Sequence, residues 1–294
     1  MPDLRVGISG WTYAGWRKDF YPKGLPARRE LWYASRHLNS IEINGSFYSL
    51  QKPDTYQRWY EETPDGFRFA VKGSRYITHN KKLRDIESAL ANFLASGILR
   101  LEEKLGPLLW QLSPRFRFDE ERIEEFFSAL PRDTAEAARI AKRHDHRLNG
   151  RAWTTSRRKR KLRHAIEPRH ESFFCEPFVR LCRRYDVAIV FSDSASWPST
   201  EEVTAGFVYL RLHGSQETYA SRYTDEELDW WAERIRLWQA GKEPPDARRC
   251  TDLPPRRHRS RDAYIYFDND AKVHAPRDAQ RLAERLGLKF EDQG

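Results

Sequence analysis

Short runs of aliphatic and aromatic residues recur along the chain, and each predicts a β-strand. We expect eight strands, at residues 4–9, 40–44, 67–72, 107–112, 164–167, 187–191, 207–213 and 263–268. Segments with apolar residues at helical spacing lie between most of these runs. They predict helices near residues 28–38, 53–62, 82–104, 119–130, 133–144, 172–185, 224–241 and 275–287.

The alternation of strands and helices predicts an α/β fold. Eight such units in 294 residues are typical of a (β/α)8 TIM barrel, with an open doubly wound sheet as the alternative. The barrel is favoured because its strands need an apolar face toward the helices, whereas polar groups can gather at the inner mouth. We predict one TIM-barrel domain over residues 1–294, with basic loop insertions near 145–163 and 243–261.

The two-residue period of a strand predicts which side chains face the barrel interior. In residues 207–213, Val208, Leu210 and Leu212 alternate with Arg211 and His213, so the two polar residues should point inward together. We expect Arg211→Met to spare the fold but abolish ligand binding, and Leu210→Asp to prevent folding. The same test predicts further polar residues at the mouth, namely Glu42, Asn44, Lys72, Gln111, Glu167, Arg169 and Asp268, with His170 and Asp193 beside them.

Such a set of charges indicates a functional site, with a satisfied polar core as the alternative. Desolvation costs several kcal/mol per ion, and barrel enzymes keep their chemistry at the carboxyl ends of the strands. We assign acid/base or other catalytic roles to Glu42, Glu167, Asp268, Lys72 and His213. Substrate binding is assigned to Asn44, Gln111, Arg169, His170, Arg211 and Asp193.

Aromatic residues in the loops after the strands extend the expected binding site. Aromatic rims stack on sugar faces or nucleobases, although such residues also pack loops. We add Trp11, Tyr13, Trp16, Tyr48 and Tyr219 to the substrate-binding set. The expected protein is a hydrolase or isomerase acting on an anionic or polyhydroxylated substrate that carries a sugar or phosphate.

The motifs predict neither a cofactor nor a metal. SGWTYAG has only two glycines and lacks the dinucleotide-binding spacing, and the three cysteines form no C-x-x-C pair. A metal site is the alternative, but three cations in the same mouth would repel the ion. That site would use Glu42, Glu167, Asp193, His213 and Asp268.

The formal net charge of +9 resides in two segments. Residues 154–163 hold six Arg and Lys residues, and residues 247–261 hold six Arg against one Asp. A nucleic-acid-binding or nuclease-like protein is therefore the second hypothesis. Both segments precede strands, so we expect them opposite the mouth, where they would support at most weak, sequence-independent binding.

Hydropathy predicts no membrane partner. No run of about 18 apolar residues occurs, and the residues after Met1 lack the pattern of a signal peptide. We therefore expect a cytoplasmic protein that acts on a small molecule, and we leave its oligomeric state open.

Several motifs together resemble one family. They are, in order, SGWTYAGW, EINGSFY, TPDGFRFAVKGSRYITH, LGPLLWQLSP, IEPRH, FVYLRLHG and YFDNDAKVHAP, from about residue 5 to residue 287. This order is similar to that of the domain-of-unknown-function family 72, also called YecE-like. The resemblance implies a barrel, and relatives are linked by fold to sugar isomerases and to an apurinic endonuclease, which is an analogy only. The basic stretch before IEPRH resembles a subfamily insertion.

Overall fold

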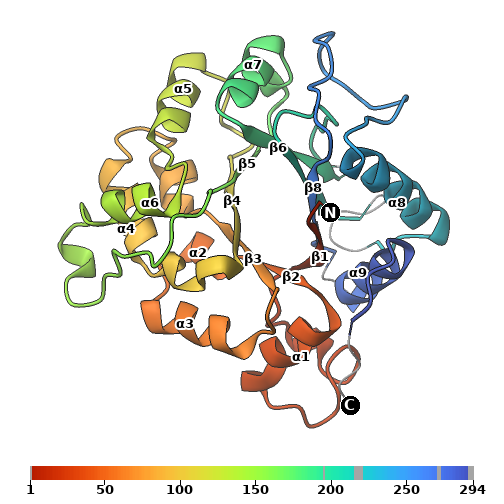
Figure 1. The fold of residues 1–294 in the computed structure, drawn as a ribbon, viewed down its shortest axis with the longest axis horizontal. Helices are drawn as coiled ribbons and strands as arrows, with labels where there is room; N and C mark the ends of the chain where they lie inside the picture. The colour runs from red at the N-terminus through yellow and green to blue at the C-terminus, as the bar shows by residue number, and fades with distance from the viewer. Residues whose placement is uncertain (1, 195, 215–220, 270–272, 291–294) are drawn as a thin grey trace.

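Eight parallel strands close into a barrel in sequence order, with β8 paired to β1 (Figure 1). This confirms the (β/α)8 prediction. The computed structural model describes residues 2–194, 196–214, 221–269 and 273–290. The strands are β1 (Leu4–Ser9), β2 (Ser40–Ile43), β3 (Arg68–Lys72), β4 (Leu105–Gln111), β5 (His164–Glu167), β6 (Val187–Asp193), β7 (Phe207–Leu212) and β8 (Asp262–Phe267).

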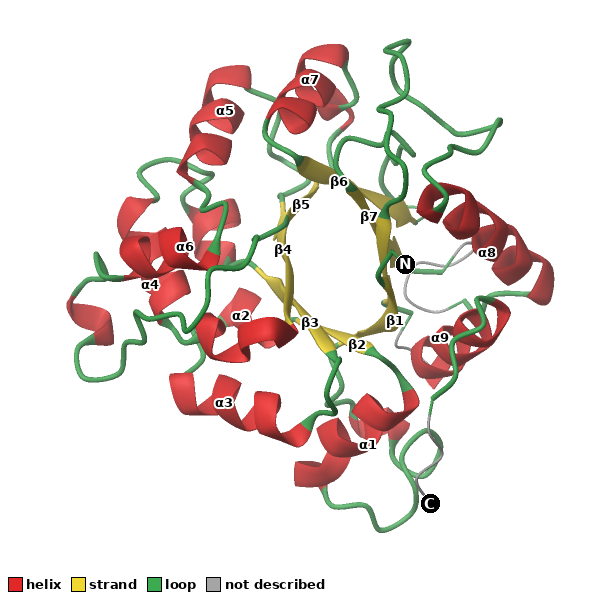
Figure 2. Cartoon of the chain, viewed as in Figure 1, coloured by secondary structure: helices red, strands yellow, loops and turns green. Residues whose placement is uncertain are grey.

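Helices surround this ring of strands on the outside (Figure 2). Two of them begin with capping residues: Thr224 and Glu227 form a reciprocal capping box, and Asp119 accepts a hydrogen bond from the Arg122 amide. The helices are α1 (Glu30–His37), α2 (Gly45–Tyr48), α3 (Pro53–Glu62), α4 (Glu87–Ala95), α5 (Glu120–Ala129), α6 (Thr134–Ala141), α7 (Glu176–Arg184), α8 (Asp225–Gln239) and α9 (His274–Arg285).

The helix expected over residues 82–104 is divided in two. Helix α4 ends at Ala95, and a 3₁₀ helix follows over Ile98–Lys104. Gly97 separates them with φ of 115°, and a Cβ at this position would lie 2.4 Å from the Pro53 Cα. Only glycine fits there, because the backbone is left-handed and α3 passes close by.

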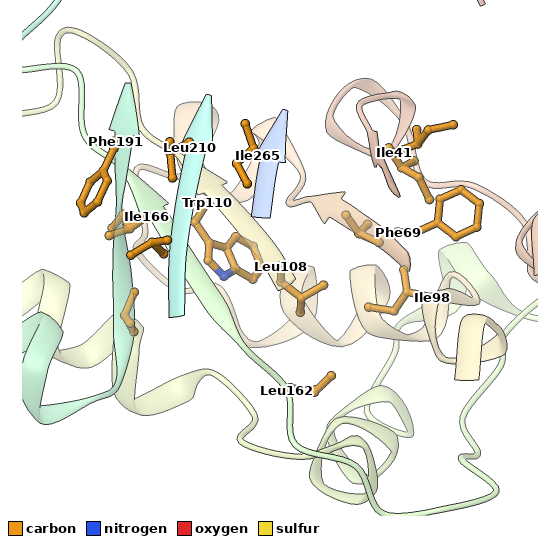
Figure 3. Packing of buried hydrophobic residues seen from close by; sticks show 14 of the residues in the cluster. Ile41, Phe69, Ile98, Leu108, Trp110, Leu162, Ile166, Phe191, Leu210 and Ile265 are labelled. Atoms are coloured by element: carbon orange, nitrogen blue, oxygen red, sulfur yellow. The ribbon is translucent and has the colours of Figure 1, made fainter. Parts of the chain in front are cut away.

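Two separate apolar clusters confirm the strand faces predicted around β7. Val208, Leu210 and Leu212 belong to the cluster that includes residues of the surrounding helices, and Figure 3 shows part of this packing. Tyr209 belongs to the second cluster, whose members come from the strands and the segment just before β7. The barrel interior is therefore packed with side chains below its mouth.

Candidate active site

Arg211 lies at the centre of the charged residues that the barrel brings together. Its side chain is only 1% exposed. Its Nε and Nη2 donate to the two oxygens of Glu42 over 3.1 and 3.0 Å. Nη1 donates to Glu167 over 3.0 Å, and Nη2 also donates to Asp268 over 2.7 Å. One guanidinium thus bridges carboxylates from β2, β5 and the end of β8.

Two neighbouring hydroxyl groups donate further hydrogen bonds to Glu42. The Tyr209 hydroxyl donates to its Oε2 over 2.6 Å, and the Ser9 hydroxyl donates to its Oε1 over 3.0 Å. Ser9 is the register partner of Glu42 across β1 and β2, while Tyr209 lies two residues before Arg211 on β7. Each oxygen of the Glu42 carboxylate therefore has two donors.

Glu167 is held in the same manner. Its Oε2 accepts from Gln111 Nε2 over 2.8 Å, in addition to Arg211. Its Oε1 accepts from Nε and Nη2 of Arg169, over 3.0 and 2.9 Å. The Arg169 guanidinium in turn stacks 3.9 Å from the centre of the Trp197 ring.

These contacts keep Glu167 and Asp268 ionised. Burial by itself raises the pKa of Glu167, but Arg169 and Arg211 hold that pKa well below its usual range. Burial also raises the pKa of Asp268, and Arg211 with His213 outweighs it, so that this pKa falls to about 2. Glu167 and Asp268 therefore lack a proton to donate at neutral pH.

Lys72 differs from the carboxylates because no oppositely charged group among the described residues contacts its amine. The residue is only 7% exposed at the end of β3, and its Nζ lies 4.5 Å from the centre of the Phe47 ring. Within the described part of the chain, its amine makes no hydrogen bond or ion pair. Burial and then repulsion by Arg211 lower the pKa of Lys72 to about 8, although the three carboxylates act in the opposite direction.

His213 lies beside Arg211 as a buried side chain of the site. Its Nε2 lies 3.0 Å from Arg211 Nη1 and 3.4 Å from Asp268 Oδ2. Its Nδ1 lies 3.3 Å from the Ser192 hydroxyl, to which Trp197 Nε1 donates over 2.8 Å. The ring is fully buried and meets the Trp197 ring edge to face.

Asp193 lies away from this cluster, so its expected placement at the mouth is corrected. On β6, Ser192 is the register partner of Arg211 and faces inward, which turns Asp193 to the opposite face. Asp193 accepts a hydrogen bond from Tyr223 over 2.9 Å and lines an outer cleft with Trp230. Both faces of β6 are apolar, and alternation therefore could not fix the direction of its last residue.

Two other predicted residues have local contacts. His170 accepts at Nδ1 from the Ser172 amide over 3.1 Å and so caps the 3₁₀ turn Glu171–Phe173. Asn44 lies just before α2, and its buried Oδ1 makes no hydrogen bond with any described residue. Among the described residues, neither His170 nor Asn44 is hydrogen-bonded to Arg211 or to its three carboxylate partners.

The aromatic residues divide into mouth and packing residues. Tyr13 donates to the Ser9 carbonyl over 2.7 Å, close to the cluster. Trp16 is 1% exposed among Tyr13, Phe20 and Tyr21, so its expected stacking on a substrate is replaced by loop packing.

The remaining aromatic predictions have separate outcomes. Trp11 packs edge-on against Trp59 with ring centres 5.1 Å apart. Tyr48 is 66% exposed, and the Arg75 guanidinium lies 5.7 Å from its ring. Tyr219 lies outside the described residues.

Sequence reasoning missed several residues that complete the site. Tyr209 and Ser9 could have been found by extending the strand alternation by one inward position. Ser192 carried no such signal, whereas Trp197 could be recognised as an aromatic residue in the loop after the sixth strand. His79 was also missed; it lies in the π-helix Tyr76–Asn80, and its ring contacts Phe47 edge to face at 5.2 Å. Burial and then Lys72 lower the pKa of His79.

Across the described ranges, no group of three or more His, Cys, Asp or Glu side chains is arranged to hold an ion. Of the alternative metal set, Asp193 is on another face, while Arg211 donates to Glu42, Glu167 and Asp268. These carboxylates are arranged around a guanidinium.

A sequence profile of the family described as "Protein of unknown function DUF72" matches residues 5–293. The chain belongs to this family. The expected YecE-like resemblance is thereby confirmed. The DUF72 chain is 32% identical to the protein UPF0759 YecE of Escherichia coli over 113 residues, which span 38% of this chain and 39% of YecE. It is 21% identical to UPF0759 YunF of Bacillus subtilis, across 98% of this chain and 96% of YunF.

Solved DUF72 structures share the fold. A protein from Thermotoga maritima superposes with a TM-score of 0.73 at 21% identity, covering 97% of this chain and 99% of that chain. One from Enterococcus faecalis gives a TM-score of 0.67 at 16% identity, over 99% and 98% of the two chains. These similarities support the barrel architecture.

The basic loops of this DUF72 chain contact acidic residues of the same chain. Lys161 pairs with Asp186 at 2.8 Å, and Arg160 pairs with Glu102 at 2.9 Å. In the second segment, Arg249 pairs with Glu202 at 3.0 Å. Arg248 reaches the outer cleft beside Asp193, so this segment is not confined to the expected face. Much of the positive charge is therefore already matched within the chain.

Within the described ranges, no helix combines the length and the apolar character needed to cross a membrane.

Proposed function

We propose that this DUF72 protein is an enzyme that acts by proton transfer on a small anionic, polyhydroxylated substrate at the barrel mouth. Lys72 is the group whose protonation changes during the reaction. The observation that carries this proposal is the contrast between the carboxylates and Lys72. Arg211 donates to all three carboxylates, whereas the Lys72 amine has no hydrogen bond or ion pair among the described residues.

The charge around Lys72 supports an anionic substrate. Arg169 is 13% exposed beside Trp197, and His79 feels the positive charges of Lys72, Arg169 and Arg75. A phosphate or carboxylate group would be attracted to this side of the mouth. Trp197 and Phe47 offer apolar surface beside these charges. Such a combination suits a sugar phosphate or a sugar acid.

The lowered pKa values of Glu167 and Asp268 count against glycoside hydrolysis by this pair of carboxyl groups. Hydrolysis by two carboxyl groups needs one that keeps its proton near neutral pH. Glu167 and Asp268 both have lowered pKa values. The amine of Lys72, with a pKa of about 8, is instead suited to exchanging a proton with carbon next to a carbonyl group.

The test is hydrogen exchange at carbon. A panel of aldose, ketose and sugar-acid phosphates is incubated with the protein in D₂O, and NMR measures deuterium next to the carbonyl. We expect exchange of at least one compound, with a loss of about a hundredfold or more in Lys72→Met. Lys23→Met, at an exposed position of the segment between β1 and α1, should keep the wild-type rate. Equal exchange by wild type and Lys72→Met, or none with compounds that bind, would overturn the proposal.

A further inference from the structure

We propose that the Lys72 amine forms a covalent imine with the carbonyl carbon of a phosphorylated aldehyde or ketone. This inference rests on the proposed function and names the reaction that the same amine would perform. It depends on the position of Lys72, on the lack of a partner for its Nζ and on the charges that surround it.

A second buried lysine shows what a structural amine looks like in this protein. Lys104 is 3% exposed, and its Nζ donates to the carbonyls of Tyr60 and Thr63, each over 2.7 Å. It also lies 3.3 Å from the Thr63 hydroxyl. Lys104 precedes β4, at the end of the barrel opposite the mouth. All its donors are used in holding the fold together.

Lys72 is also buried, at 7% exposed, but it has none of these contacts. Its amine forms no hydrogen bond with a described residue, and the ring of Phe47 covers it at 4.5 Å. An amine that is largely desolvated and has no acceptor in the protein costs stability, because the lost hydration of its charge is only partly regained. Such a cost is typical of functional sites. In the neutral amine, no described residue donates a hydrogen bond to the nitrogen lone pair.

The nearby carboxylates do not trap Lys72 as a salt bridge. The oxygens of Glu42 accept from Arg211, Ser9 and Tyr209, while those of Glu167 accept from Arg211, Arg169 and Gln111. Because these donors are already in place, Lys72 remains available to a ligand. The pKa of about 8 means that about a tenth of the amine is neutral at pH 7.

The chemical step balances without a further reactant. The nitrogen of neutral Lys72 attacks the carbonyl carbon, and the resulting carbinolamine loses its hydroxyl group as water. Overall, the ammonium and the carbonyl compound yield a protonated imine and one water molecule, so that charge and hydrogen atoms are conserved. The positive imine then withdraws electrons from the adjacent C–H bond and makes its proton more acidic; that proton passes to another base of the mouth or to water, because the Lys72 nitrogen is now bonded to carbon.

The charged groups facing Lys72 come from several elements. Glu42 on β2, Glu167 on β5, Arg211 on β7 and Asp268 after β8 act on its pKa, and His79 of the π-helix senses its charge. Arg169 and Arg75 add positive charge on the same side. These cations would hold the phosphate group while the carbonyl reaches Nζ.

The experiment traps the imine with sodium borohydride. Pyridoxal 5′-phosphate and glyceraldehyde 3-phosphate serve as probes, and peptide mass spectrometry locates the reduced adduct. We expect Lys72 to be labelled before exposed lysines, with half-maximal labelling near pH 8. Pyridoxal, which lacks the phosphate, should label Lys72 about tenfold more slowly.

Variants separate the imine from the broader proposal. Lys72→Arg, checked for folding by circular dichroism, should lose the adduct, and Lys23→Arg should keep it. Labelling spread over exposed lysines with Lys72 unmodified would overturn the imine. If Lys72-dependent deuterium exchange persists without an adduct, Lys72 acts as a base and only the imine is rejected. Loss of both signals in the wild type would overturn both proposals.

Discussion

Arg211 and Glu42 meet through two hydrogen bonds, from Nε and Nη2 to the two carboxylate oxygens, in the closed interior of the barrel. The residues are 169 positions apart in the chain. Because Arg211 also neutralises Glu167 and Asp268, the pair is part of the fold as well as of the site.

Replacement of Arg211 should therefore destabilise the protein, contrary to the sequence-based expectation that Arg211→Met spares the fold. The substitution leaves three buried carboxylates without their shared cation. We expect a loss of about 3–5 kcal/mol in the free energy of unfolding at pH 7, measured by urea denaturation. Arg184→Met, which breaks the exposed pair with Glu124, should change it by less than about 1 kcal/mol. Equal stability of the two variants would contradict the central role of Arg211.

Leu210→Asp is predicted to prevent folding. Leu210 is fully buried in the cluster between strands and helices, where a carboxylate would have no partner. Circular dichroism should show loss of the native spectrum. A well-folded variant would mean that the faces of β7 are reversed.

His164 should limit stability in mild acid. Its Nδ1 accepts from Trp110 Nε1 over 3.1 Å, so Nε2 carries the hydrogen and donates to the Pro131 carbonyl over 2.7 Å. Burial lowers the pKa of His164 to about 4, although the Pro131 hydrogen bond opposes this shift. The unfolded chain, with a histidine pKa of about 6.5, binds the proton more readily. The stabilisation is therefore complete above about pH 6.5 and is lost as the pH falls toward 4.

The free energy of unfolding should fall by about 3 kcal/mol through His164 as the pH falls from 6.5 to 4. Urea denaturation at several pH values measures it. His164→Gln should have a flatter pH profile between 6.5 and 4, whereas His146→Gln, at an exposed site, should keep the wild-type slope. If the free energy of unfolding of His164→Gln depends on pH as steeply as that of the wild type, groups other than His164 cause the acid sensitivity.

Asp268 should contribute to the free energy of unfolding at lower pH than His164 does. Its pKa of about 2 lies below the value of about 3.9 in an unfolded chain. The folded state thus favours the ionised form, and the stabilisation is present above about pH 4 and lost as the pH falls toward 2. Asp268→Asn should reduce the pH dependence in this window. An unchanged profile would contradict the ion pair with Arg211.

The pH dependence of the proposed reaction should follow Lys72. Exchange or imine formation needs the neutral amine, so the rate at saturating probe should rise with pH and level off above about pH 8. A rate that is flat between pH 6 and 10 would show that Lys72 does not control the reaction.

Nucleic-acid binding, if measured, should be weak and independent of sequence. Arg158, Arg257 and Arg259 are exposed residues of the basic segments, and their replacement by Gln should weaken it further. Fluorescence anisotropy with a labelled duplex at 150 mM salt provides the measurement. Nanomolar affinity that survives these changes, or depends on Trp11, would favour the nucleic-acid hypothesis.

Local pattern alone determined much of the architecture. The periods of hydrophobic residues predicted the positions of the strands, because buried strands need apolar side chains wherever they pack. The alternation in β7 also indicated that Arg211 and His213 share a face. In β6, where both faces are apolar, the pattern left the direction of Asp193 undetermined.

Tertiary structure decided which of these residues act on one another. Barrel closure brings Glu42, Glu167 and Asp268 to a single guanidinium, and no local spacing encodes that meeting. It also buries Trp16 in a loop and leaves Lys72 without an acceptor among the described residues. Sequence determined the residue types and the faces they occupy because these follow from backbone geometry. The charge states of the site residues and the availability of Lys72 to a ligand depend on distances between strands that are remote in sequence. Only the closed barrel sets these distances.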